Sequence, residues 1–183
     1  AFQKAIEMSS GDVIFFLDSD DYFHQDKIGK IVDLFSNDAN KMIIYDFPII
    51  LRNNSEIIQK KTKNIFNTYW GYIHPTSCIS VRKKFINKVF DITLSKNFTN
   101  IWLDLRILLF SKYLHTYNTI DENLTYYRQT EDNVSSKFKK FSKNWWSRRN
   151  EAHDYFFDFI EKNNLRAGKN LDFYITKFIN KII

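Results

Sequence analysis

The sequence predicts an α/β domain followed by a helical C-terminal extension. An apolar run, Val13–Leu17, has the length and composition of a buried strand and ends in the carboxylates of Asp18, Asp20 and Asp21. Before Asn144, apolar residues recur at strand and helix periods in alternating order. From Asn144 onward only the helical period remains. Alternation of this kind is typical of a sheet flanked by helices, and the change of period separates the extension from it.

The elements follow from the positions of apolar residues and of residues that end helices and strands. Residues 1–8 are expected to be helical, and Ser9-Ser10-Gly11 ends that helix. The further expected elements are a helix over 28–37, a strand over 41–51 that pairs with Ile57-Ile58 beyond a turn at Asn53-Asn54, a strand over 77–81 before a basic helix start at 82–84, a helix over 102–114, and extended segments over 116–120 and 124–128. We therefore expect one domain over residues 1–136.

The extension, residues 137–183, is expected to be a helical hairpin that turns near Gly168. It combines aromatic side chains with the basic residues Arg148 and Arg149. A helix with Trp and Phe on one face and Lys or Arg on the other can lie in a bilayer interface. Packing on the rest of the chain or on a twin subunit is the commoner use of such helices, so the sequence favours packing and leaves membrane contact open.

Composition indicates a globular protein. Hydrophobic residues make up 44% of the 183 residues, which excludes general disorder, and the formal net charge is +6. That charge suits an anionic partner such as a nucleotide, an acidic glycan or a lipid headgroup, although a Lys-, Asn- and Ile-rich composition gives the same sign. No nucleic acid partner is expected.

Cys78 is the only cysteine, so an intramolecular disulfide is excluded. A cytoplasmic location is therefore expected, with a peripheral position at the inner face of the membrane left open.

The acidic run after the first strand predicts a metal and phosphate site. Open α/β sheets bind ligands where strands end, and hard cations such as Mg²⁺ or Mn²⁺ prefer oxygen ligands. A cation there would offset the mutual repulsion of Asp18, Asp20 and Asp21. The alternative is a capped turn in which the Asp side chains bond backbone N–H groups.

Three segments carry a resemblance to a known family. Residues 10–21, with Gly11-Asp12 before the strand and the acids after it, resemble a segment of family 2 glycosyltransferases with the GT-A fold. Trp102-Leu103-Asp104 resembles the acidic catalytic motif of that family, and Tyr126-Tyr127-Arg128-Gln129 is similar to a later Tyr-Arg segment. The resemblance implies a mixed sheet flanked by helices. It also implies an enzyme that moves a sugar from a nucleotide-diphosphate donor to a glycan or lipid-linked acceptor, with inversion, in bacterial surface polysaccharide or glycoconjugate synthesis.

The resemblance assigns the donor side of the site to four residues. Asp20 would bind Mn²⁺ or Mg²⁺ directly, and Asp18 would contact the donor ribose or the metal. Asp21 would act on the metal through water or another ligand, and Arg128 would neutralise a phosphate oxygen. A structural role in an ion pair is the alternative for Arg128.

The acceptor side follows in the same way. Asp104 would take the proton of the acceptor hydroxyl, and its expected place in the first turn of a helix favours the ionised carboxylate. Trp102 would offer a flat face to an acceptor sugar. Independently of the resemblance, His74 lies in an expected turn, residues 71–77, that would line the acceptor side of the cleft. The alternatives are a helix-capping Asp104, a core Trp102 and a structural His74.

Two departures and two alternatives complete the prediction. Thr130 stands where relatives often carry a histidine, and the family's first βα unit would precede Ala1, so we expect a partial domain. A haloacid-dehalogenase-type phosphatase also places Asp-x-Asp after a buried strand, but Asp21-Tyr22-Phe23 stands where its Gly-Thr is expected. A non-catalytic fragment or membrane-associated binding module is the other alternative.

Overall fold

The computed structural model describes residues 2–53, 55–60, 68–86, 98–114, 117–130 and 137–183. The chain divides into two compact units. The first unit comprises Ala1–Thr62, Ile73–Leu94 and Leu103–Gln129, and the second comprises Lys63–Tyr72, Ser95–Trp102 and Thr130–Ile183. The expected C-terminal extension thus lies within the second unit.

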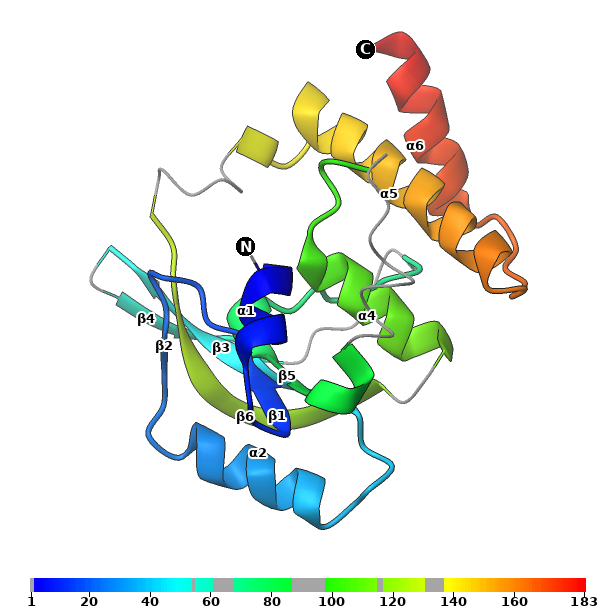
Figure 1. Cartoon of the computed structure of the whole chain (residues 1–183). Helices are drawn as coiled ribbons and strands as arrows, with labels where there is room; N and C mark the ends of the chain where they lie inside the picture. Colours follow the sequence, from blue (N-terminus) through cyan, green and yellow to red (C-terminus); the bar gives the residue numbers. More distant parts are fainter. Residues whose placement is uncertain (1, 54, 61–67, 87–97, 115–116, 131–136) are drawn as a thin grey trace. The chain divides into compact units, whose positions relative to one another are not determined.

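The first unit is built on a mixed sheet (Figure 1). Its strands are β1 (Val13–Phe15), β2 (Tyr22–Phe23), β3 (Ile43–Arg52), β4 (Ser55–Ile58), β5 (Ile79–Arg82) and β6 (Tyr117–Arg128). They follow the order β1-β5-β3-β6-β2, and β4 pairs with β3. The pair β3–β6 is parallel and the other described pairs are antiparallel. The mixed sheet and the β3–β4 hairpin confirm the predictions.

Helices lie on both faces of this sheet. Helix α2 (Lys27–Ser36) packs Ile31 and Phe35 against Ile44 of β3 and Leu124 of β6. The residue after Ile44 in β3 is Tyr45, and its hydroxyl is 2.9 Å from the hydroxyl of Ser111 in α4 (Leu103–Leu114). Since consecutive strand residues point to opposite faces, α2 and α4 cover opposite faces of the sheet. Helix α1 (Phe2–Met8) precedes β1, and residues 83–86 are helical after β5, as the sequence predicts.

Three expectations about the strands and helices need correction. Strand β1 is half-buried instead of buried, because among the described strands only β5 pairs with it. The two expected extended segments form the one strand β6, whose pairing with β3 shifts register between Tyr45 and Pro48. Helix α4 is buried from Leu105 to Ser111 on all sides, and not along one stripe only.

The second unit contains the predicted helical hairpin, α5 (Lys143–Lys162) and α6 (Leu171–Ile182). Side chains at the N-cap positions begin both helices: Ser142 Oγ accepts from Trp145 N, and Asn170 Oδ1 accepts from Phe173 N. Within this unit the ring of Tyr69 stacks on Phe156, with ring centroids 4.2 Å apart. No helix in the described part of the chain is long and apolar enough to span a bilayer.

Candidate functional site

The acidic turn lies between β1 and β2 of the first unit. It is closed by a hydrogen bond from Asp21 N to Asp18 O of 3.1 Å. Asp20 is exposed, Asp18 is half-buried, and Asp21 is 8% exposed. The three carboxylates therefore differ in their access to a ligand, which their spacing in the sequence does not reveal.

Asp21 anchors the turn to two other elements. Its Oδ2 accepts from Ser77 Oγ at 2.6 Å, and its Oδ1 accepts from the backbone N–H of Arg128 at 2.9 Å. Ser77 lies in the 3-10 helix η1 (Thr76–Cys78), and its Oγ also accepts from Asp18 N at 3.0 Å. One serine hydroxyl thus holds both ends of the acidic turn, and both oxygens of Asp21 are engaged.

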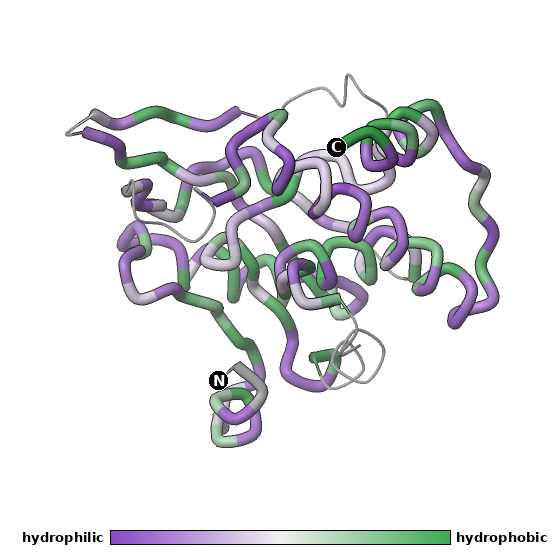
Figure 2. The backbone as a smooth tube through the Cα atoms, turned by 90° about the horizontal axis from the view of Figure 1, so that it is seen from above, coloured by the Kyte–Doolittle hydropathy of each residue, from purple (hydrophilic) through white to green (hydrophobic). Residues whose placement is uncertain are grey.

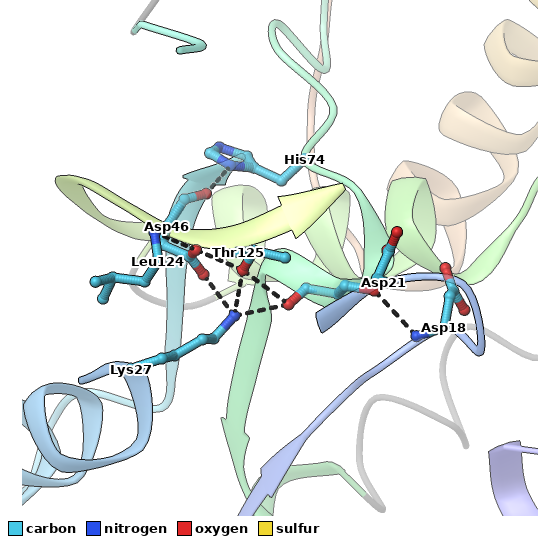
Figure 3. Close-up of polar contacts among 8 residues, drawn as sticks. Asp18, Asp21, Lys27, Asp46, His74, Leu124 and Thr125 are labelled. Carbon is cyan, nitrogen blue, oxygen red and sulfur yellow. Dashed lines mark hydrogen bonds and ion pairs between the residues drawn. The ribbon is translucent and has the colours of Figure 1, made fainter. Parts of the chain in front are cut away.

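A buried ion pair lies next to Ser77 (Figure 3). Lys27 Nζ donates to Asp46 Oδ1 at 2.8 Å, to the carbonyl oxygen of Ser77 at 2.7 Å and to Thr125 Oγ1 at 2.6 Å. The Thr125 hydroxyl donates to Asp46 Oδ2 at 2.6 Å, and the backbone N–H of Leu124 donates to the same oxygen. All three donors of the ammonium group are therefore satisfied.

This ion pair connects α2, β3, β6 and η1, and η1 carries the serine that holds the acidic turn. Both Lys27 and Asp46 are fully buried. Sequence reasoning missed the pair, although Asp46 is the one charged residue in the apolar run 42–47 and a buried carboxylate requires a partner.

Asp104, the predicted base, is near enough to the acidic turn to act on Asp18 electrostatically. Burial, and after it repulsion from Asp21, Asp20 and Asp104, raises the pKa of Asp18 from 3.8 to about 6. Asp104 lies in the first turn of α4, where its Oδ1 accepts from Leu105 N at 2.7 Å. The fold thus gathers Asp18, Asp20, Asp21 and Asp104 from two distant segments of the first unit.

Arg128 lies at the end of β6, beside the same turn. It is exposed, and its positive charge acts to lower the pKa of Asp21, although burial raises that pKa overall. Its backbone N–H is fixed by Asp21, so the position of the residue is set while its guanidinium lies at the surface. Arg128 is therefore on the acidic side of the first unit, where a phosphate contact is expected.

His74 and Trp102, the residues predicted on the acceptor side, lie in different units. His74 is 1% exposed; its Nδ1 is 2.8 Å from Asp46 O and its Nε2 is 3.0 Å from the Tyr117 hydroxyl. Burial lowers the pKa of His74 to about 4, so the ring is neutral at pH 7. Trp102 belongs to the second unit, where the Arg148 guanidinium lies 3.8 Å from the centre of its ring.

The donor set suits a Mg²⁺ or Mn²⁺ ion that is shared with a ligand. Among the described residues, no three or more Asp, Glu, His or Cys side chains converge closely enough to hold a metal alone. Mg²⁺ is commonly held by one or two carboxylates together with substrate phosphates and water. Burial and, after it, the neighbouring carboxylates raise the pKa of Asp18, and a bound cation would act against both by favouring the ionised form. Asp18 and Asp20 are thus a fitting pair of ligands, provided that a phosphate supplies further oxygens.

Comparisons with known proteins identify the family. The model of the family described as Glycosyl transferase family 2 matches residues 1–98. An uncharacterized glycosyltransferase of Nostoc sp. is 31% identical over 140 residues, which are 70% of this chain and 42% of the relative. The chain therefore spans less than half the length of that curated relative.

Solved structures share the fold. The S. aureus protein TarS (residues 1-349) in complex with UDP-GlcNAc aligns with a TM-score of 0.54 and 12% identity, over 83% of this chain and 44% of that one. The same protein in complex with UDP aligns with a TM-score of 0.52 and 10% identity, over 83% and 43%. At this level of identity the likeness supports the GT-A fold, as predicted.

Proposed function

The chain belongs to glycosyl transferase family 2, and from this premise we propose that it carries the metal-binding and acceptor-side part of a nucleotide-sugar glycosyltransferase. The observation that carries the proposal is the electrostatic proximity of Asp104 to the Asp18–Asp21 turn. Sugar transfer needs a group that stabilises the departing diphosphate and a base for the acceptor hydroxyl. Acidic residues at these two places in one unit supply both. Family membership gives no support to the phosphatase alternative.

The donor side consists of Asp18, Asp20, Asp21 and Arg128. Asp20 and Asp18 would hold Mn²⁺ or Mg²⁺, which when bound supplies positive charge to the leaving diphosphate. Arg128, which lies at the exposed end of β6, would bind a phosphate oxygen of the donor. Asp21 keeps the turn in place through Ser77 and Arg128 N. A UDP-sugar is the donor class to test first, because TarS is solved with UDP-GlcNAc.

Asp104 is the proposed base. Its place in the first turn of α4 favours the ionised carboxylate, which can accept the proton of an attacking hydroxyl. Attack from the side opposite the diphosphate inverts the anomeric carbon. The acceptor class is a glycan or a lipid-linked glycan, as expected for surface polysaccharide or glycoconjugate synthesis at the cytoplasmic side of a membrane.

The acceptor roles of His74 and Trp102 require movement or an indirect effect. His74 is buried and hydrogen-bonded through both ring nitrogens, so it acts by supporting Asp46 and Tyr117. Trp102 can receive a sugar on its ring only where Arg148 does not cover it. Asp104 is therefore the residue on which the acceptor side of the proposal depends.

The test combines donor binding with transfer. UDP-, GDP- and dTDP-sugars are titrated calorimetrically into the chain with Mn²⁺, and again with EDTA and with Asp20→Asn. We expect UDP-sugar binding that EDTA and Asp20→Asn both abolish, whereas Asp104→Asn retains binding. In the full-length protein, Asp104→Asn should reduce transfer by about 10²- to 10⁴-fold, as for loss of a general base. Metal-independent donor binding, or full transfer by Asp104→Asn, would contradict the proposal.

A further inference from the structure

Helix α6 of the second unit carries an apolar stripe on its exposed side. Leu171, Phe178 and Ile182 are 74%, 65% and 67% exposed, and Tyr174 and Ile175 are 58% and 43% exposed. Their spacing places all five on one face of a helix. The residue that α6 buries, Thr176, lies on another face. Figure 2 shows the hydrophobic end of the chain at the C-terminal mark.

Polar contacts fix the rotation of α6 about its own axis. Asp172 forms an ion pair with Arg149 of α5, and its Oδ2 lies 3.1 Å from His153 Nε2 of the same helix. Asn180 Nδ2 donates to the carbonyl oxygen of Trp146 at 3.0 Å. Rolling the apolar stripe onto α5 would break these contacts and expose the buried His153. The stripe is therefore held outward by the packing of the hairpin itself.

A basic segment lies beside this helix pair. Residues 137–150 contain six Lys and Arg residues and no Asp or Glu, and Lys137, Lys139, Lys140 and Lys143 are exposed. The segment leads into the start of α5, which contacts the last turns of α6 through the Trp146–Asn180 hydrogen bond. Positive charge and exposed apolar side chains thus occur together at this end of the hairpin.

An aromatic side chain in the same segment is also exposed. Phe141 is 62% exposed, and its φ of 67° lies in the left-handed region that bulky side chains rarely adopt. Its ring contacts those of Trp145 and Trp146, with centroid distances of 5.4 and 6.4 Å. Strained exposed residues of this kind are concentrated at binding sites.

We propose that this face of the second unit, the α6 stripe with Phe141 and the basic segment, binds the interface of an anionic lipid bilayer. Interfacial helices place Trp, Phe and Leu among the acyl chains and Lys or Arg among anionic headgroups. A helix of the length of α6 extends about 18 Å, too short to span but sufficient to lie in the headgroup region. Neither the donor site nor Asp104 is needed for this binding.

The bilayer is a better occupant than a second copy of the chain. The five side chains of the stripe expose about 600 Å² in total, whereas a stable protein interface buries about 800 Å² on each partner. The acid-free composition of residues 137–150 also matches an anionic surface directly. The experiment must therefore distinguish binding to the bilayer from self-association of the chain through α6.

The test is vesicle flotation of the whole chain with two matched pairs of variants. Vesicles of phosphatidylcholine with phosphatidylglycerol should bind the chain, pure phosphatidylcholine should bind it less, and added salt should weaken the binding. Phe178→Ser with Ile182→Ser should weaken it at least about tenfold. Ile57→Ser with Ile58→Ser on β4, where both are also exposed, should leave it unchanged.

The electrostatic part is tested by Lys137→Glu with Lys139→Glu, against Lys4→Glu with Lys84→Glu in the first unit. All four lysines are exposed, so these variants should remain folded, which circular dichroism checks. Equal loss with either pair, or binding that is indifferent to salt and to phosphatidylglycerol, would overturn the proposal. Light scattering tests the other outcome. If the chain is a dimer, binds no vesicles and becomes a monomer with Phe178→Ser and Ile182→Ser, the stripe binds a second copy and the membrane proposal is overturned.

Discussion

The substitution Asp18→Asn is expected to stabilise the fold at neutral pH. Asp18 is half-buried, and its pKa is raised from 3.8 to about 6, chiefly by burial and then by the neighbouring carboxylates. The stability that Asp18 contributes is complete below its unfolded pKa of 3.8 and is lost as the pH rises through about 6. Above pH 6 the folded protein therefore carries an ionised carboxylate at an energetic cost that asparagine removes.

The magnitude follows from the two pKa values. Their difference corresponds to about 3 kcal/mol at about 1.4 kcal/mol for each pKa unit, and solvent screening of a partly exposed group reduces this to about 1 kcal/mol. For a chain of this length, 1 kcal/mol raises Tm by about 2–4 °C. The change should be present at pH 8 and absent at pH 4, where Asp18 is protonated in the folded protein.

The assay is thermal unfolding at both pH values, with and without Mn²⁺ and UDP. Asp33→Asn, on the exposed side of α2, removes the same charge away from the turn and is the matched control. In the presence of Mn²⁺ and UDP the order should reverse, because ligands that bind only the folded wild type stabilise it. A Tm at pH 8 that Asp18→Asn does not raise, or raises equally at pH 4, would refute the reasoning about the turn.

Other perturbations test the contacts around the turn and within the hairpin. Lys27→Met leaves Asp46 buried without its partner and should lower the free energy of unfolding, measured by urea titration, by about 3–5 kcal/mol. The double variant Lys27→Met with Asp46→Leu should recover part of this loss, because it leaves no buried charge unpaired. Ser77→Ala should cost about 1–3 kcal/mol and also weaken Mn²⁺–UDP binding; unchanged binding would show that the serine only supports the fold. Burial acts to raise the pKa of Asp172, but the contacts of its carboxylate with His153 and Arg149 lower it overall. The stabilising effect of Asp172 is therefore lost as the pH falls. The protection of the α6 amides against hydrogen exchange, corrected for the intrinsic exchange rate at each pH, should therefore decrease in acid, and Asp172→Asn should remove that decrease.

Local patterns were sufficient to predict most of the fold. The apolar run before Asp18, the β3–β4 hairpin and the helical period of α5 and α6 each depend on residues close in sequence. Strand β2 was missed because it is only Tyr22–Phe23, and its place depends on β6, where the ring of Tyr126 stacks on Tyr22 at 4.4 Å. Two residues carry no periodicity from which a strand can be predicted.

The candidate site was predictable only in part. The family resemblance placed Asp18 and Asp104 together before any geometry was known, and the structure brings both into the first unit. The Lys27–Asp46 pair and the burial of His74 depend on contacts between residues far apart in sequence. No local pattern distinguishes a lysine that begins a helix in solvent from one that is buried beneath a sheet.

The engagement of Asp21 by Ser77 and Arg128 N has a consequence for the order in which ligands bind. With both Asp21 oxygens occupied, the turn offers a cation two carboxylates, Asp18 and Asp20. Two negative charges and incomplete coordination hold a free divalent ion weakly, whereas a diphosphate brings further oxygens with it. Metal and nucleotide should therefore enter as one complex, so Mn²⁺ alone gives little heat in calorimetry and the Mn²⁺–UDP complex gives saturable binding.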